Sequence, residues 1–180
     1  GYTDDRIILI VEDDIADNVS NPNKGVIQVT IGGNNVYENV EIDYRMSSLK
    51  AKDILAILNG EKSESLPTVI ESTENDNLFV FWSGHGVPGA MCWDEEPYAM
   101  TGDDLSTVFK DMNLKRRYRK LLMMVEACFS GGVMEQCEGI PGMLFITAAN
   151  GDETSKADVF NGEMKVWMSN RFTSTFIEQI

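Results

Sequence analysis

Two apolar runs of the sequence each end in a short glycine-rich segment that carries a reactive side chain. Residues 78–82 lead directly into the letters SGHG, which contain His85, the only histidine of the chain. Residues 121–125 lead into the letters EACFSGG, which contain Cys128. Continuous apolar runs are typical of parallel strands buried on both faces, and α/β sheets carry their sites at the carboxyl ends of such strands. The sequence therefore predicts a parallel sheet with His85 and Cys128 at one edge.

If the two strands are neighbours, His85 and Cys128 can act together as a base and a nucleophile. A free thiol has a pKa of about 8.5 and is mostly protonated at neutral pH, so a nucleophilic cysteine needs a nearby base. His85 can take the proton of Cys128 or stabilise the thiolate as imidazolium. Flanking glycines leave backbone N–H groups exposed. We expect the N–H groups of Gly86 and Cys128 to form an oxyanion hole for acyl transfer.

Each of the two residues also has a simpler explanation. A cysteine after an apolar strand is commonly a small buried hydrophobe, and a histidine in a glycine-rich loop is commonly a turn residue. The two sites nevertheless support each other, because both follow strands of the same type and both lie in glycine-rich turns. We therefore interpret His85 as a general acid and base and Cys128 as a nucleophile.

The rest of the sequence alternates between strand and helix patterns. Further strands are expected at residues 6–11 and 143–148, and a small hairpin at residues 27–31 and 35–37. Apolar residues at helical spacing predict amphipathic helices at residues 48–59, 102–112 and 170–180. Such alternation indicates a mainly parallel α/β sheet with helices on both faces. Residues 60–77 form the longest expected loop.

The composition fits one domain over residues 1–180. At 43% hydrophobic residues the chain can bury one sizeable core. No stretch reaches the ~18 consecutive apolar residues that a membrane helix requires, and a net charge of −14 argues against nucleic acid as a partner. Three cysteines (Cys92, Cys128 and Cys137) leave at least one thiol free or paired outside the chain. No ligand spacing indicates a metal site, and no cofactor is expected.

Several segments resemble the legumain (asparaginyl endopeptidase) family, peptidase family C13. The letters around His85 and Cys128 resemble the histidine and cysteine motifs of that family. Further similar segments follow in the family's order at residues 12–16, 21–25, 35–37, 40–45, 115–118 and 147–150. The segments at residues 35–37, 40–45 and 115–118 are more similar to the catalytic subunit of the GPI-anchor transamidase. The Glu-Ala-Cys triplet and the Ser-Gly-Gly tail favour the protease branch.

The resemblance implies a caspase-like fold and a cysteine endopeptidase that acts on protein or peptide substrates. By resemblance, Glu126 lines the primary specificity pocket, and Thr154 and Asn170 lie near other pocket positions. A carboxylate there can accept the side-chain N–H of an asparagine, so cleavage is expected after Asn, with Asp possible. Asn170 stands where legumains tend to have an acid, which leaves a strict Asn preference open. The family also implies export, to a secreted, cell-envelope or endolysosomal location, although the residues themselves specify no compartment.

The resemblance further implies a strand and a helix that come before the segment matching residues 1–11. In caspase-like folds that strand lies inside the sheet, between the strands matching residues 6–11 and 78–82. Without it, two rows of backbone groups would be unpaired. We therefore expect an N-terminal fragment of the same precursor, freed by self-cleavage before Gly1, to remain bound. A truncated start is the alternative.

Two other functions remain open at this point. A transpeptidase or transamidase would form the same acyl-enzyme and resolve it with an amine in place of water, and no residue separates the two outcomes. A non-catalytic scaffold of caspase-like fold is the other alternative. The intact pair of His85 and Cys128 argues against the scaffold.

Overall fold

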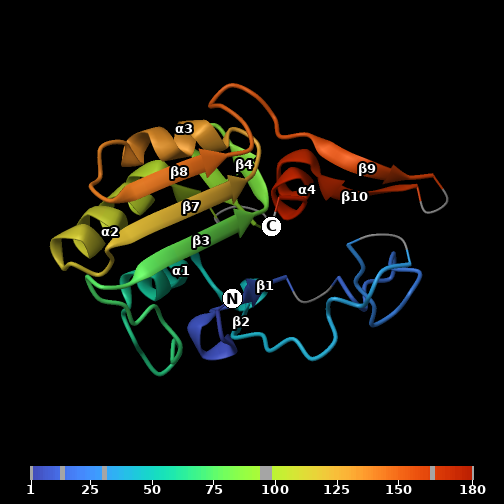
Figure 1. Cartoon of the computed structure of the whole chain (residues 1–180), viewed down its shortest axis with the longest axis horizontal. Coiled ribbons are helices and arrows are strands. Elements are labelled where there is room, and N and C mark those ends of the chain that lie inside the picture. Colours follow the sequence, from blue (N-terminus) through green and yellow to red (C-terminus); the bar gives the residue numbers. More distant parts are fainter. Residues whose placement is uncertain (1, 13–14, 30–31, 94–98, 163–164, 180) are drawn as a thin grey trace.

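A three-stranded parallel sheet forms the centre of the molecule in the computed structural model, which describes residues 2–12, 15–29, 32–93, 99–162 and 165–179. Its strands, in spatial order, are β3 (Asn77–Ser83), β7 (Lys120–Glu126) and β8 (Met143–Thr147). The predicted apolar runs therefore form adjacent parallel strands (Figure 1). Ser83 pairs with Glu126, so β3 and β7 end at the same level.

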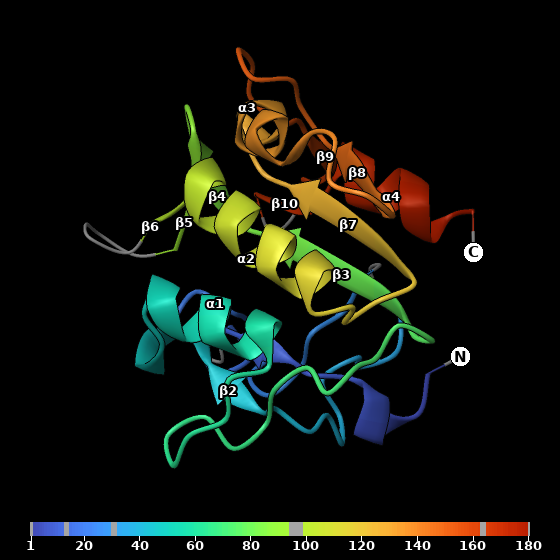
Figure 2. The same cartoon turned by 90° about the vertical axis from the view of Figure 1, so that its left-hand side faces the viewer.

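Helices lie on both faces of this sheet, as predicted. Their bounds are α1 (Ala51–Asn59), α2 (Gly102–Leu114), α3 (Ser130–Met134) and α4 (Arg171–Ile177). The first three lie on one face and α4 lies on the other (Figures 1 and 2). On the first face, the ring of Phe109 in α2 lies 6.1 Å from that of Phe145 in β8. On the second, the ring of Phe176 in α4 lies 6.4 Å from that of Phe79 in β3.

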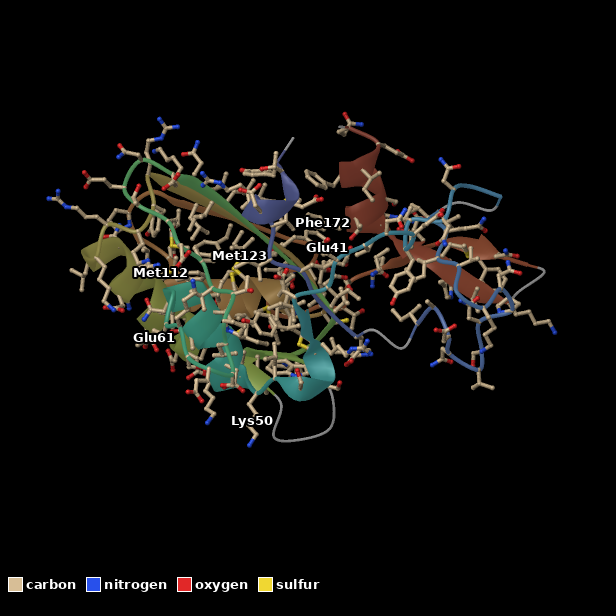
Figure 3. All side chains as sticks on the ribbon, turned by 90° about the horizontal axis from the view of Figure 1, so that it is seen from below. Glu41, Lys50, Glu61, Met112, Met123 and Phe172 are labelled. Carbon is tan, nitrogen blue, oxygen red and sulfur yellow. The ribbon has the colours of Figure 1, made fainter. Side chains whose placement is uncertain are left out.

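The hydrophobic core fills the space between the sheet and the layer of α1 and α2. Met112 and Met123 are fully buried there, whereas Lys50 and Glu61 extend outward (Figure 3). Each large apolar side chain buried in this way stabilises the fold by about 1.5–3 kcal/mol. This core fixes the position of β3 and β7, and therefore of the residues that follow them.

Local signals explain where the two longest helices begin and end. Thr101 and Asp104 form a reciprocal capping box at the start of α2, with the Asp104 N–H donating to Thr101 Oγ1 at 3.2 Å and the Thr101 N–H donating to Asp104 Oδ2 at 3.0 Å. α1 ends at Gly60, which adopts a left-handed conformation with φ of 69°. The predicted helix at residues 48–59 is shortened at its start, where Met46–Ser48 forms a 3-10 turn instead.

Shorter sheets surround the central one, and most were not predicted. They comprise β1 (Ile10–Val11) with β2 (Tyr44–Arg45), β4 (His85–Val87) with β5 (Ala90–Cys92) and β6 (Ala99–Thr101), and β9 (Ala157–Asn161) with β10 (Val166–Asn170). β1 and β2 are parallel, and the other pairs are antiparallel. Two further 3-10 turns lie at Asp4–Arg6 and Glu135–Cys137. Within the described residues, no strand pairs with the edge of β3 opposite β7.

The predicted hairpin at residues 27–31 and 35–37 was wrong in its described part, which contains no strand. The two segments do meet, because the Val36 N–H donates to the Ile27 carbonyl at 2.8 Å. The Ile27 N–H, however, donates to the side-chain oxygen of Asn35 at 2.9 Å. An asparagine side chain thus takes the place of a strand partner. Residues 30 and 31 lie outside the described part of the chain.

The terminal elements are shorter than the sequence indicated. The strand expected at residues 6–11 is reduced to β1, and the helix expected at residues 170–180 to α4. Residues 60–77 contain no helix or strand until β3 begins, as predicted. No described helix is long and apolar enough to cross a membrane.

Candidate active site

The loops that carry His85 and Cys128 meet at the carboxyl ends of β3 and β7. The Gly84 N–H donates to the carbonyl of Glu126 at 3.0 Å, which extends the pairing of the two strands by one step. Beyond it, Gly86 lies directly against Cys128: a Cβ atom at position 86 would overlap the Cys128 carbonyl oxygen. Glycine is therefore the only residue that fits here without a backbone shift. This contact explains how the loops of His85 and Cys128 come to lie side by side, as predicted.

Cys128 occupies a sharp turn between β7 and α3. The residue after it, Phe129, has a positive φ of 55°, a strained conformation for a side chain of this size. Its N–H donates to the carbonyl of Glu153 at 2.9 Å, which helps to hold the turn. Cys128 itself is half-buried, and its N–H has no hydrogen-bond acceptor among the described residues. That N–H is therefore available to a bound oxyanion.

The glycines after Cys128 allow α3 to pack closely on the segment that follows β8. A Cβ atom at Gly131 would lie only 2.9 Å from the Cα atom of Asn150. The Gly131 N–H donates to the carbonyl of Ala149 at 3.0 Å, and the hydroxyl of the buried Ser130 donates to the same oxygen at 3.3 Å. These contacts hold the turn of Cys128 from its far side.

His85 is the first residue of β4 and is exposed. Its strand pairs with β5, where Cys92 lies opposite His85. Met91 of β5 and Met100 of β6 are fully buried and attach this small sheet to the core. His85 is thus carried on an anchored strand while its imidazole remains accessible to a substrate.

Glu126 is buried although it carries a carboxylate, with 1% of its surface exposed. One oxygen, Oε2, accepts hydrogen bonds from the Thr173 N–H at 3.1 Å and from the Thr173 hydroxyl at 2.9 Å. The other oxygen, Oε1, is buried and has no hydrogen-bond partner among the described residues. A buried acidic group of this kind, two residues before Cys128, is a candidate for binding a substrate side chain.

The segment of Thr154 reaches the cysteine, although Thr154 itself is exposed. The carbonyl of Glu153, the residue before Thr154, accepts the hydrogen bond from the Phe129 N–H. The hydroxyl of Ser155, the residue after Thr154, lies 3.6 Å from the sulfur of Cys128. Asn170 is half-buried and immediately precedes α4, three residues before Thr173. The structure thus brings the segments of Thr154 and Asn170 to Cys128 and to Glu126 respectively.

The sequence did not reveal Ser155 or Thr173 as neighbours of the site. Ser155 adjoins Thr154 in the sequence, so the resemblance indicated the loop that carries it. Thr173 lies 47 residues from Glu126, and no local pattern connects the two.

The other cysteines differ from Cys128 in their surroundings. Cys137 is fully buried, and burial raises the pKa of its thiol to about 11. It therefore stays protonated and unreactive at neutral pH. Cys92 is half-buried in β5, and none of the three cysteines forms a disulfide.

Comparison with known proteins finds similar sequences among cysteine peptidases. The chain is 29% identical over 182 residues to legumain of Rattus norvegicus, an alignment that covers 99% of this chain and 41% of the relative. It is 35% identical over 161 residues to the vacuolar-processing enzyme of Vicia sativa, covering 86% of this chain and 32% of the relative. It is 35% identical over 159 residues to hemoglobinase of Schistosoma mansoni, covering 86% and 36%.

The chain therefore spans about two fifths or less of the length of these relatives. The similarity is not confined to the two motifs, because the profile of the peptidase C13 family matches residues 1–180. On this evidence the chain belongs to the peptidase C13 family.

Proposed function

We propose that this chain is the peptidase domain of a legumain-type cysteine endopeptidase, which hydrolyses peptide bonds after Asn and accepts Asp less readily. The observation that carries the proposal is the contact of Gly86 with the Cys128 carbonyl, which joins the loops of the only histidine and of the half-buried cysteine. Membership of the peptidase C13 family supports the same reaction.

In the proposed reaction, the sulfur of Cys128 attacks the scissile carbonyl and His85 receives the thiol proton. The resulting oxyanion accepts hydrogen bonds from the backbone N–H groups of Gly86 and Cys128, and each such donor is worth roughly 3 kcal/mol. Collapse breaks the C–N bond, and His85 returns its proton to the departing amine. Water, activated by His85, then hydrolyses the thioester and restores Cys128.

Specificity would come from Glu126, beside the nucleophile. Its unpaired Oε1 can accept a hydrogen bond from the side-chain amide of a substrate Asn. An ionised substrate Asp offers no such donor and is repelled by the carboxylate until the Asp is protonated at lower pH. Thr154 and Asn170 would complete the pocket from the segments after β8 and before α4.

A peptide library that varies the residue before the cut bond tests this function. We expect cleavage after Asn at neutral pH, and cleavage after Asp to gain as the pH falls, because protonation removes the repulsion. Adding a nucleophilic amine separates hydrolysis from aminolysis: a hydrolase yields mainly the free acid, whereas a transamidase yields mainly the amide. Preference for a basic or large apolar residue would contradict the assignment and place the enzyme nearer clostripain-like relatives.

We also propose that a further segment of the same precursor completes the sheet beside β3. Among the described strands none pairs with that edge of β3, so its backbone groups would need another partner. The face toward α4 is also apolar and open, with Phe81, Leu144 and Ile146 exposed by 41%, 59% and 40%. A cavity of about 450 Å³ lies between this face and α4.

Native mass spectrometry of the active enzyme tests this assembly. We expect a short second polypeptide that dissociates only on unfolding, since each unpaired buried backbone group would cost about 1–3 kcal/mol. If the enzyme cuts its own precursor, a Cys128→Ala precursor stays uncut. A folded, active 180-residue chain without a second polypeptide would contradict the proposal.

A further inference from the structure

We propose that Thr173 is a positioning residue for specificity: it holds one oxygen of Glu126 so that the other stays free for the substrate side chain. This inference rests on the proposed function, in which Glu126 recognises Asn. It begins from the unequal surroundings of the two oxygens of a single buried carboxylate.

Oε2 of Glu126 is held by both donors of one residue. The Thr173 N–H lies 3.1 Å from it and the Thr173 hydroxyl 2.9 Å. Hydrogen bonds to an ionised acceptor are stronger than those between neutral groups. The carboxylate cannot rotate Oε2 away without breaking both bonds, so Thr173 fixes its orientation.

Oε1 of Glu126 is buried and without a partner among the described residues. Most buried polar atoms in folded proteins are hydrogen-bonded, and an unpaired one is unfavourable. A carboxylate that served only to cap α4 would be expected to pair both oxygens or to leave the second in water. We therefore assign the unpaired Oε1, two residues before Cys128, as the acceptor for a substrate donor. An asparagine side chain supplies two such N–H donors.

Contacts that do not involve Glu126 hold α4 in place. The Ser174 hydroxyl donates to Asp158 Oδ2 at 3.0 Å, and the Arg171 N–H donates to the Lys156 carbonyl at 2.8 Å. The ring of Phe176 packs against that of Phe79. Because α4 has these anchors, the Thr173 hydroxyl is not required to hold the helix and can serve to orient Glu126.

The lack of a local cap explains why the backbone of Thr173 is available to Glu126. Asn170 occupies the capping position of α4, yet its side chain makes no capping hydrogen bond. The first-turn N–H groups of a helix need an acceptor, and a carboxylate is well suited to that end. Glu126 supplies this acceptor from β7, and so joins α4 to the strand that leads to Cys128.

The experiment compares Thr173→Val with Thr173→Ser on two peptides that differ only in Asn or Asp before the cut bond. Valine matches threonine in shape and keeps the N–H but lacks the hydroxyl donor. We expect the Asn-to-Asp ratio of kcat/KM to fall about tenfold in Thr173→Val, the size of one hydrogen bond to a charged group. The fall should come mainly from the Asn peptide. Thr173→Ser should keep the wild-type ratio within about twofold, because it restores the donor.

Ser174→Ala is the matched control, because it removes the neighbouring hydroxyl of the same helix and its bond to Asp158 but leaves Glu126 untouched. We expect its Asn-to-Asp ratio to equal that of the wild type. A merely structural role of Thr173 would lower kcat/KM on both peptides alike and leave the ratio unchanged, and that result would overturn the inference.

Glu126→Gln separates failure of this inference from failure of the proposed function. An unchanged ratio in Glu126→Gln means that Glu126 does not select the substrate, and the proposed specificity fails. A lowered ratio in Glu126→Gln with a normal ratio in Thr173→Val overturns only the role of Thr173. If the Asn-to-Asp ratio falls in both single variants, the double variant should show no further fall in this ratio, because the two residues act through one contact.

Thermal unfolding of each variant shows whether the kinetic values come from folded protein. If Thr173→Val does not fold, Thr173→Ala takes its place, since it also keeps the N–H and lacks the hydroxyl. Failure of both variants to fold assigns Thr173 a structural role and overturns the inference.

Discussion

Replacing Cys128 with Ala is expected to abolish peptide cleavage, with turnover reduced by at least about 10⁴-fold. In the proposed reaction the sulfur is the atom that forms the acyl-enzyme, and its one side-chain contact of hydrogen-bond type among the described residues is with the Ser155 hydroxyl at 3.6 Å. A hydroxyl is much less acidic than a thiol and a weaker nucleophile at neutral pH, so Ser155 should not take over the reaction. The rate of release of a fluorogenic Asn peptide measures the effect.

Thiol labelling supplies the control for Cys128. Iodoacetamide at pH 7.5 should alkylate Cys128 and stop cleavage, while Cys137 stays unmodified. Burial raises the pKa of Cys137 to about 11, so its thiol is protonated at any pH well below that value and reacts only once the protein unfolds. Peptide mapping by mass spectrometry locates the label. Normal cleavage by Cys128→Ala, or inactivation with the label only on Cys92, would refute the assignment of the nucleophile.

The parts of the fold that could be predicted are those with a continuous or periodic apolar signal. Residues 78–82 and 121–125 are apolar throughout, and they form adjacent parallel strands as predicted. Burial on both faces holds for β7, whereas β3 leaves Phe79 and Phe81 exposed on the face toward α4. The helix expected at residues 48–59 ends where predicted, because Gly60 follows it and glycine adopts a φ of 69° without strain. Apolar runs and a helix-ending glycine are local features of the sequence, and packing in the core stabilises the same elements that they predict.

The parts that could not be predicted depend on contacts between distant segments. β4, β5 and β6 have three residues each, too few for a period of two to be seen, and they are held by the burial of Met91 and Met100. In the hairpin expected at residues 27–31 and 35–37, the side chain of Asn35 takes the place of a strand partner for Ile27. In the site, the sequence pointed to the loops of His85 and Cys128, but it could not pair Glu126 with Thr173 across 47 residues.

Replacing His85 with Ala is expected to lower turnover by about 10²–10⁴-fold, the usual effect of losing acid–base catalysis. The variant should fold normally, because His85 is exposed and the sheet of β4 is anchored by residues of β5 and β6. The loss should lie in kcat more than in KM, since in the proposed reaction the imidazole transfers protons and does not bind the substrate side chain. Near-normal turnover in His85→Ala would refute the pairing.

The placement of His85 can be tested without removing it, through the glycine that follows. A Cβ atom in Gly86→Ala would overlap the Cys128 carbonyl oxygen, so the two loops must move apart and the proton transfer between them should slow. We expect kcat to fall by at least about tenfold, while the far-ultraviolet circular dichroism stays that of the wild type. Gly162→Ala is the matched control, because a Cβ atom there meets nothing within 4 Å and the φ of Gly162 is an ordinary one. If both glycine variants retain full activity, close apposition of the two loops is not required for catalysis, and His85 must act on Cys128 from some other arrangement.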